Sequence, residues 1–135
     1  MRFFFDRCLS KRLAHMLAIY EKGSHHIVHL DDDPRFEITT PDVTWMSVLD
    51  ADNEPPWVVI TKDERIAKNK VEREMLRNVS MKFFFLKRQW DQMQLPAIVW
   101  RFFKVWPDIV RTAKADEGRL FEISGSTNLS ITRYT

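Results

Sequence analysis

The chain has 135 residues, of which 44% are hydrophobic, and it carries 21 Lys and Arg against 19 Asp and Glu. This length fits one domain of about 100–150 residues, which can bury a core without a disulfide or metal staple. Three Gly and six Pro exclude a collagen-like or low-complexity chain. A formal net charge of +2 neither demands nor excludes a nucleic-acid partner. We therefore expect a single domain over residues 1–135.

Cys8 is the single cysteine, so neither an internal disulfide nor a cysteine-rich zinc site can form. A lone thiol is simplest in a reducing compartment. No apolar run approaches the ~18 residues that span a bilayer. The first ten residues are too short and too charged for a secretory signal. We expect a cytoplasmic protein with no membrane partner.

In chain order, short apolar runs alternate with helical patterns. The run Phe3–Phe5 predicts a first strand, which ends at an acid. Ser10 predicts the N-cap of a first helix, and Gly23 fits its C-terminal stop. A second strand is expected over residues 26–30.

The middle of the chain repeats this alternation. Thr40 as N-cap and Pro41 at the first helical position predict a second helix. The β-branched run Trp57–Thr61 predicts a central strand. Asn69 resembles the start of a capping box, so a third helix should follow it. Residues 82–86 should form the fourth strand.

The last third contains a long helical stripe of apolar residues from Ile98 to Ala113. Pro107 should kink or divide that helix, because proline removes a backbone donor. A fifth strand is expected over residues 120–123, and residues 129–132 alternate as a short terminal strand should. The order β-α-β-α-β-α-β-α-β predicts an α/β fold, a three-layer α/β/α sandwich with a mainly parallel sheet.

Acids at the carboxyl ends of the strands are the main candidates for chemistry, because ligands bind at that edge of such sheets. Asp6 follows the first strand, and Asp63 follows the third. If these strands are neighbours (order 2-1-3-4), both carboxylates share one crevice, and Asp42 opens a helix near the same edge. Mg²⁺ or Mn²⁺ would relieve their repulsion. Taken singly, each acid is better explained by a turn or a helix N-terminus, and the functional interpretation depends on all three meeting at one edge.

Basic residues flank these acids and could hold the phosphates of a nucleic acid. The candidates are Arg12, Lys62, Arg65 and Arg73. The alternative is an ordinary solvated helix face.

Other conspicuous residues are better explained by structure. His26 and His29 fall on opposite faces of a strand, which argues against a shared metal site. The run Asp31–Asp33 is typical of a solvated turn, and Cys8 of buried packing. The aromatic clusters around Phe83–Phe85 and Trp100–Trp106 are expected in the core, although five Trp leave room for a partner interface.

Several segments together resemble the PIN-like domains of VapC-type toxins from bacterial toxin–antitoxin pairs. The most specific parts are the acid that ends the first strand and the Thr-x-Asp motif that ends a buried strand. The segments that carry the resemblance are Phe3–Asp6, Leu9–Ala14, His29-Leu30, Thr40–Asp42 with Trp45, Trp57–Asp63, Arg65-Ile66, Asn69, Phe83–Leu86 and Trp106-Pro107.

The resemblance implies an endoribonuclease that depends on Mg²⁺ or Mn²⁺ and hydrolyses RNA. Asp6 matches the first-strand acid, Asp63 the Thr-x-Asp acid and Asp42 the intervening helical acid. The family's usual fourth acid has no clear counterpart, and Thr44 stands where a further acid is expected. The resemblance also implies a cognate antitoxin protein and a homodimer.

Two alternatives follow from these departures. A catalytically inactive PIN-like module that binds RNA or protein would not need the missing acid. A receiver-like signalling domain also places Asp after its first and third strands. Receivers usually carry a further acid beside the first and a Lys after the fifth strand, where this chain has Arg7 and Ser124-Gly125.

Overall fold

A six-stranded sheet forms the centre of the computed structural model, which describes residues 1–62, 69–126 and 128–133. The strand order is β2-β1-β3-β4-β5-β6. The strands are β1 (Arg2–Phe5), β2 (His26–His29), β3 (Trp57–Thr61), β4 (Lys82–Leu86), β5 (Leu120–Ile123) and β6 (Ile131–Arg133). The first five run parallel, and β6 pairs antiparallel with β5.

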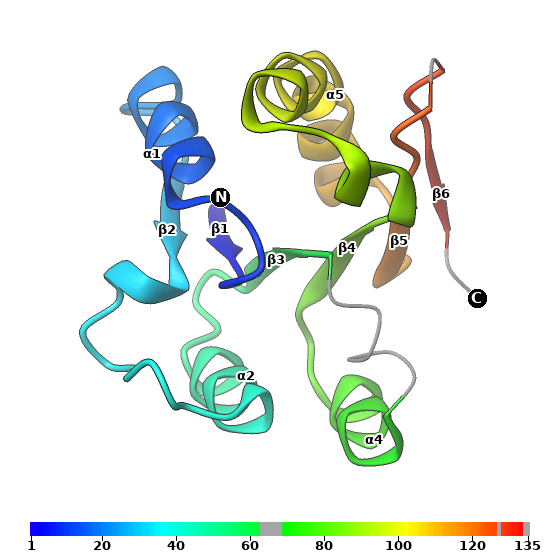
Figure 1. Ribbon diagram of the computed structural model, residues 1–135. Coiled ribbons are helices and arrows are strands. Elements are labelled where there is room, and N and C mark those ends of the chain that lie inside the picture. The colour runs from blue at the N-terminus through cyan, green and yellow to red at the C-terminus, as the bar shows by residue number, and fades with distance from the viewer. Residues whose placement is uncertain (63–68, 127, 134–135) are drawn as a thin grey trace.

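Helices cover both faces of this sheet (Figure 1). The helices α1 (Lys11–Tyr20) and α5 (Leu95–Ala115) lie on one face, and α2 (Asp42–Ala51) and α4 (Lys70–Asn78) lie on the other. Two 3-10 helices, η1 (Leu30–Asp32) and η2 (Arg88–Gln92), follow β2 and β4. The predicted α/β/α sandwich, its mainly parallel sheet and the 2-1-3-4 order are therefore confirmed.

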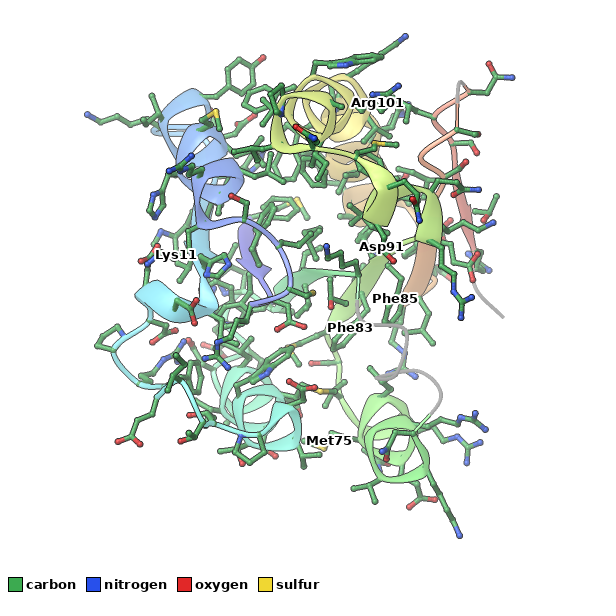
Figure 2. The ribbon with its side chains drawn as sticks, in the orientation of Figure 1. Lys11, Met75, Phe83, Phe85, Asp91 and Arg101 are labelled. Atoms are coloured by element: carbon green, nitrogen blue, oxygen red, sulfur yellow. The ribbon has the colours of Figure 1, made fainter. Side chains whose placement is uncertain are left out.

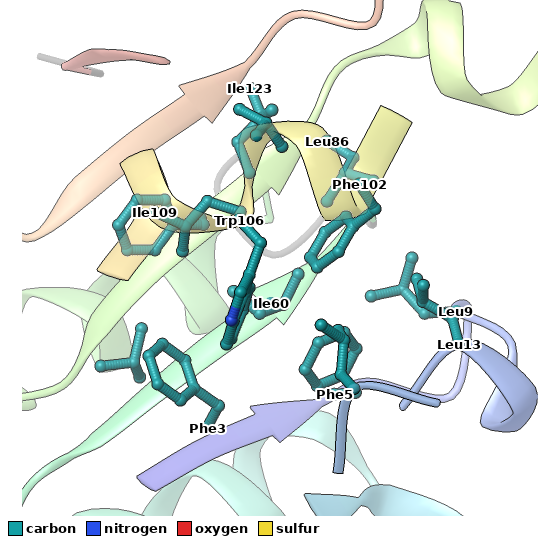
Figure 3. Packing of buried hydrophobic residues seen from close by; sticks show 14 of the residues in the cluster. Phe3, Phe5, Leu9, Leu13, Ile60, Leu86, Phe102, Trp106, Ile109 and Ile123 are labelled. Carbon is teal, nitrogen blue, oxygen red and sulfur yellow. The ribbon is translucent and has the colours of Figure 1, made fainter. Parts of the chain in front are cut away.

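The apolar strands fill two cores, because successive side chains of a strand point to opposite faces. Phe3 and Phe5 pack with α1 and α5, whereas Phe4 packs with α2 and α4. In Figure 3, Phe3 and Phe5 face Phe102 and Trp106 of α5, and the rings of Phe3 and Trp106 lie 4.6 Å apart. Coverage of both faces explains why β1, β3 and β4 are continuous apolar runs.

The expected start of α2 is wrong by one position. Pro41 itself is the N-cap, and its side chain makes no capping bond. The Thr40 hydroxyl instead accepts a 2.8 Å hydrogen bond from the backbone N–H of Glu37, so it is used by the preceding turn. The helix therefore begins at Asp42.

Of the two expected effects of Pro107, a kink or a division, the division is wrong, because α5 is one helix that contains Pro107. The buried residues on its inner side include Phe102, Val105, Trp106 and Ile109. Pro107 lies on the exposed side, where water can satisfy the carbonyl group that loses its donor. Packing of the buried side of α5 thus stabilises a continuous helix, although Pro107 disfavours helical structure.

Three smaller expectations need correction. Trp100 is 53% exposed and is not a core residue. The run Asp31–Asp33 is not uniformly solvated, since Asp33 is buried against Arg35. The terminal strand lies at Ile131–Arg133 rather than at residues 129–132. Within the described residues, no helix is long and apolar enough to cross a membrane.

Candidate active site

Neighbouring strands bring Asp6 and Thr61 together at the carboxyl edge of the sheet. Phe5 of β1 is in register with Ile60 of β3, and the Asp6 N–H continues the ladder with a 3.0 Å hydrogen bond to the Ile60 carbonyl. Asp6 is only 4% exposed, and Thr61 is fully buried. A carboxylate this deeply buried needs hydrogen-bond donors around it.

Those donors come from three neighbours. Oδ1 of Asp6 accepts a 2.6 Å hydrogen bond from the backbone N–H of Arg7, and Oδ2 accepts one of 2.8 Å from the Thr61 hydroxyl. The Cys8 thiol lies 3.7 Å from the same Oδ2 and 3.4 Å from the Thr61 Oγ1. We call Asp6, Cys8 and Thr61 the Asp6 cluster. Its contacts fix the orientation of the carboxylate before any ligand arrives.

The Cys8 thiol also accepts a 3.4 Å hydrogen bond from the backbone N–H of Lys62. Cys8 therefore joins the loop after β1 to the end of β3. The expectation that Cys8 serves packing alone is therefore incomplete, because its thiol contacts the acid. The two-residue spacing from Asp6 to Cys8 was the available signal.

Arg7 and Lys62 form charged contacts near this edge. Nε of Arg7 lies 2.6 Å from Oδ1 of Asp31, and Nζ of Lys62 lies 3.7 Å from Oδ1 of Asp91 in η2. Figure 2 labels Asp91 near the top of β4. Both pairs are partly exposed, so solvent screens them and an incoming phosphate can exchange with the carboxylates.

His29 stabilises the segment that contains Asp31, the ion-pair partner of Arg7. Its side chain is buried, with Nε2 2.7 Å from the carbonyl oxygen of Leu9. Its Nδ1 accepts a 3.1 Å hydrogen bond from the backbone N–H of Asp31. The proton of the neutral ring therefore sits on Nε2, which donates to Leu9. Both ring nitrogens of His29 therefore have backbone partners.

Interactions within α2 explain the presence of an acid at Asp42. It is the first residue of α2, where a carboxylate is favoured by the helix dipole. Its Oδ1 accepts a 2.9 Å hydrogen bond from the indole N–H of Trp45. Across the part of the chain that the structure describes, no group of three or more His, Cys, Asp and Glu side chains could hold a metal ion. Joint metal binding by Asp6, Asp42 and Asp63 stays a prediction.

The remaining predicted site residues are dispersed. Asp63 and Arg65 lie outside the described residues. Arg12 is exposed in the first turn of α1, which Ser10 caps by accepting a hydrogen bond from the Arg12 N–H. Arg73 is exposed on α4, on the opposite face of the sheet from Arg12. Both arginines lie in the first turns of their helices, Arg12 in α1 and Arg73 in α4.

The chemistry of the Asp6 cluster suits a hard cation in part. A carboxylate has about four lone-pair positions, and the Arg7 N–H and the Thr61 hydroxyl donate to the carboxylate of Asp6. Carboxylate and hydroxyl oxygens are the ligands that Mg²⁺ and Mn²⁺ prefer. The described residues supply one such carboxylate, so a complete site would need a further acid, for which Asp63 is the predicted source.

The fold is a mainly parallel α/β sandwich with a buried acid, Asp6, at the carboxyl edge of two adjacent strands. A family model described as a PIN-like domain matches residues 1–88. The match covers more than half of the chain, and the chain therefore belongs to the PIN-like domain family. It spans β1 to β4 with the whole Asp6 cluster, and leaves out α5, β5 and β6. Searches of curated proteins and of solved structures found no match.

Proposed function

We propose that this PIN-like domain is an endoribonuclease that depends on Mg²⁺ or Mn²⁺ and acts as the toxin of a toxin–antitoxin pair. The observation that carries the proposal is the buried Asp6 carboxylate, oriented by Thr61 at the carboxyl ends of β1 and β3. A nuclease site needs such a fixed acid, because a preorganised group need not reorganise during the reaction.

In this proposal Asp6 and Asp63 hold the cation, with Asp42 as a further ligand. When bound, such a cation polarises a phosphoryl oxygen and lowers the pKa of water. Lys62 and Arg65 position the scissile phosphate, and Lys62 must leave Asp91 to do so. Arg12 and Arg73 supply further backbone contacts, Arg12 from the face of α1 and Arg73 from that of α4. The toxin role implies a cognate antitoxin protein, and the resemblance implies a homodimer.

The proposal is tested by RNA cleavage with a dual-labelled oligonucleotide in the presence of Mn²⁺. Asp6→Asn and Asp63→Asn should each abolish cleavage, whereas Asp108→Asn, on the exposed side of α5, should leave it unchanged. Circular dichroism checks that each variant is folded. Cleavage that persists at the wild-type rate in both site variants would overturn the proposal.

The alternative is a catalytically inactive PIN-like module that binds RNA or protein. The observation that favours it lies in the sequence, where the family's usual fourth acid has no clear counterpart and Thr44 stands where a further acid is expected. Calorimetric titration with Mn²⁺ separates the two. The nuclease should bind Mn²⁺ and lose that binding in Asp6→Asn, whereas an inactive module should bind none.

A further inference from the structure

Positive charge is concentrated on the helical layer formed by α1 and α5. Together these helices carry six Lys and Arg residues and a single carboxylate, Asp108. The whole chain, by contrast, is close to balance, with 21 basic and 19 acidic residues. Asp108 is itself paired with Arg111 on the next turn of α5. Lys11 lies 3.8 Å from Asp32 of η1, so the excess positive charge of this layer comes from Arg12, Arg101, Lys104 and Lys114.

Aromatic side chains on this layer are exposed rather than buried. Tyr20 is 67% exposed and Trp100 is 53% exposed. The ring of Tyr20 meets that of Phe103 edge-on, with centroids 5.6 Å apart. Trp100 lies three residues before Phe103 and hence on the same side of α5. Aromatic surface therefore runs from α1 across to α5.

Trp100 is held in place by its neighbour. The guanidinium carbon of Arg101 lies 4.3 Å from the centroid of the indole ring, and Nη1 of Arg101 donates a 3.3 Å hydrogen bond to the Ala97 carbonyl. The indole thus has a fixed cation against one face, while more than half of the side chain remains open. Figure 2 marks Arg101 on α5. We call Tyr20, Trp100, Arg101, Phe103 and Lys104 the aromatic–basic face.

The positive charge of the aromatic–basic face indicates which kind of partner can bind there. A second copy of the chain would bring two surfaces of the same sign together, which disfavours self-association here. Lys104 and Arg12 are exposed, and neither has a carboxylate at ion-pair distance in the described part of the chain. A polyanion would supply the missing charges. Exposed rings beside cations are the features with which proteins hold unpaired bases and their phosphates.

The two helices that carry this face begin near the Asp6 cluster. The first turn of α1 begins five residues after Asp6, and α5 follows η2, whose Asp91 pairs with Lys62. Both helices therefore start at the sheet edge that holds the cluster (Figure 1). A strand of a few nucleotides that leaves the cluster past Arg12 can run between α1 and α5 toward Tyr20 and Trp100.

We propose that the aromatic–basic face binds unpaired bases of single-stranded RNA whose backbone passes the Asp6 cluster. This inference rests on the proposed function and adds to it a binding surface made of residues that the acidic site does not contain. Trp100 and Tyr20 stack on bases, and Arg101, Lys104 and Arg12 contact phosphates.

The test is binding of a fluorescein-labelled uridine 12-mer, measured by anisotropy in EDTA so that no cleavage can occur. Trp100→Ala and Tyr20→Ala should each raise Kd about tenfold or more, since that is the order expected for the loss of one stacked base. Val71→Ala is the matched control, because Val71 is equally exposed but lies on α4, across the sheet. It should leave Kd unchanged.

Two further arms test the nature of the ligand. An abasic 12-mer of the same charge should bind several-fold more weakly and should not respond to Trp100→Ala. Equal binding of the two oligonucleotides would mean that charge alone acts and would overturn the proposal. The proposal would also be overturned if a Glu-rich peptide bound tightly and Trp100→Ala abolished that binding while RNA binding persisted. That result would assign the face to a protein partner.

The same assay separates this inference from the proposed function. Asp6→Asn should abolish cleavage in Mn²⁺ yet keep uridine 12-mer binding in EDTA. Failure of cleavage in the wild-type protein would contradict the nuclease proposal. Wild-type binding by Trp100→Ala and Tyr20→Ala would contradict the stacking face, whether or not the protein cleaves RNA.

Discussion

The hydroxyl of Thr61 donates a 2.8 Å hydrogen bond to the Asp6 carboxylate, joining two side chains that are 55 residues apart in the sequence. Both side chains are buried, so the bond is sheltered from competing water. Because β1 and β3 are neighbours, this pair exists only in the folded sheet. It ties the stability of the central strands to the orientation of the candidate catalytic acid.

Thr61→Val should destabilise the protein and impair its chemistry, because Oδ2 of Asp6 then loses a donor without gaining water. We expect a loss of about 1–2 kcal/mol in the free energy of unfolding, measured by urea denaturation, and slower RNA cleavage in Mn²⁺. Thr61→Ser is the control, since it keeps the hydroxyl. If Val and Ser behave alike, the hydrogen bond is not what matters at this position.

Asp33 should make the protein sensitive to acid. Burial alone would raise the pKa of Asp33, but the hydrogen bonds and charge of Arg35 outweigh it and hold that pKa below its ordinary value of 3.8. The folded state therefore favours the charged form. The resulting stability is present above pH 3.8 and is lost as the pH falls through the lower pKa of the folded state.

Asp33→Asn should accordingly lower the free energy of unfolding by about 1–2 kcal/mol at pH 7, a value reduced because Arg35 is partly exposed. The difference from wild type should shrink as the pH falls below 3.8. Asp108→Asn removes an exposed pair within one helix and should change stability by less than about 0.5 kcal/mol. If the difference in free energy of unfolding between wild type and Asp33→Asn stayed constant with pH, Asp33 would not be the source of the acid sensitivity.

His25 predicts a second, higher pH window. Burial is the main reason that the pKa of His25 falls below its ordinary value of 6.5, and the N-terminal ammonium adds to it. Glu21 acts in the opposite direction. The unfolded chain therefore takes up a proton first, so stability should decrease as the pH falls from 6.5 toward the lower pKa of the folded state.

His25→Gln should remove this dependence, which thermal unfolding between pH 7.5 and 5 would show as a flatter profile of Tm against pH. His26→Gln replaces an exposed neighbour and serves as the control. An unchanged slope in His25→Gln would assign the pH dependence to other groups.

Gly125 should not tolerate a side chain. A Cβ at this position would lie 2.8 Å from Cδ1 of Trp90, whose indole N–H donates a 3.1 Å hydrogen bond to the Ile123 carbonyl. Trp90 is 1% exposed and anchors η2, so it has little room to move. Gly125→Ala should cost about 1–3 kcal/mol of stability in thermal or urea unfolding. Ser130→Ala, an exposed control on the same segment, should be neutral, and equal stability of the two variants would contradict the clash.

Much of the fold could be predicted from the order of its elements, but local rules failed where packing overrode them. Pro107 predicted a kinked or divided helix, yet α5 is a single helix with one buried side. Trp100 was expected in the core on composition alone, and the phase of α5 turns it to solvent instead. Whether a residue of α5 faces the core or the solvent depends on the rotation of the helix about its axis. Apolar composition does not predict that rotation when every side of the helix carries apolar residues.

The sequence by itself determined that this is an alternating α/β chain with an acid after its first strand and a Thr-x-Asp motif after its third. Those features follow from local periodicity and from the order of the strands. The tertiary structure decided which groups touch Asp6. It placed the Thr61 hydroxyl and the Cys8 thiol against its carboxylate and left the rings of Tyr20 and Trp100 open on the positive helical layer. Such contacts depend on strand pairing and helix phase, which bring together residues that are far apart in the chain.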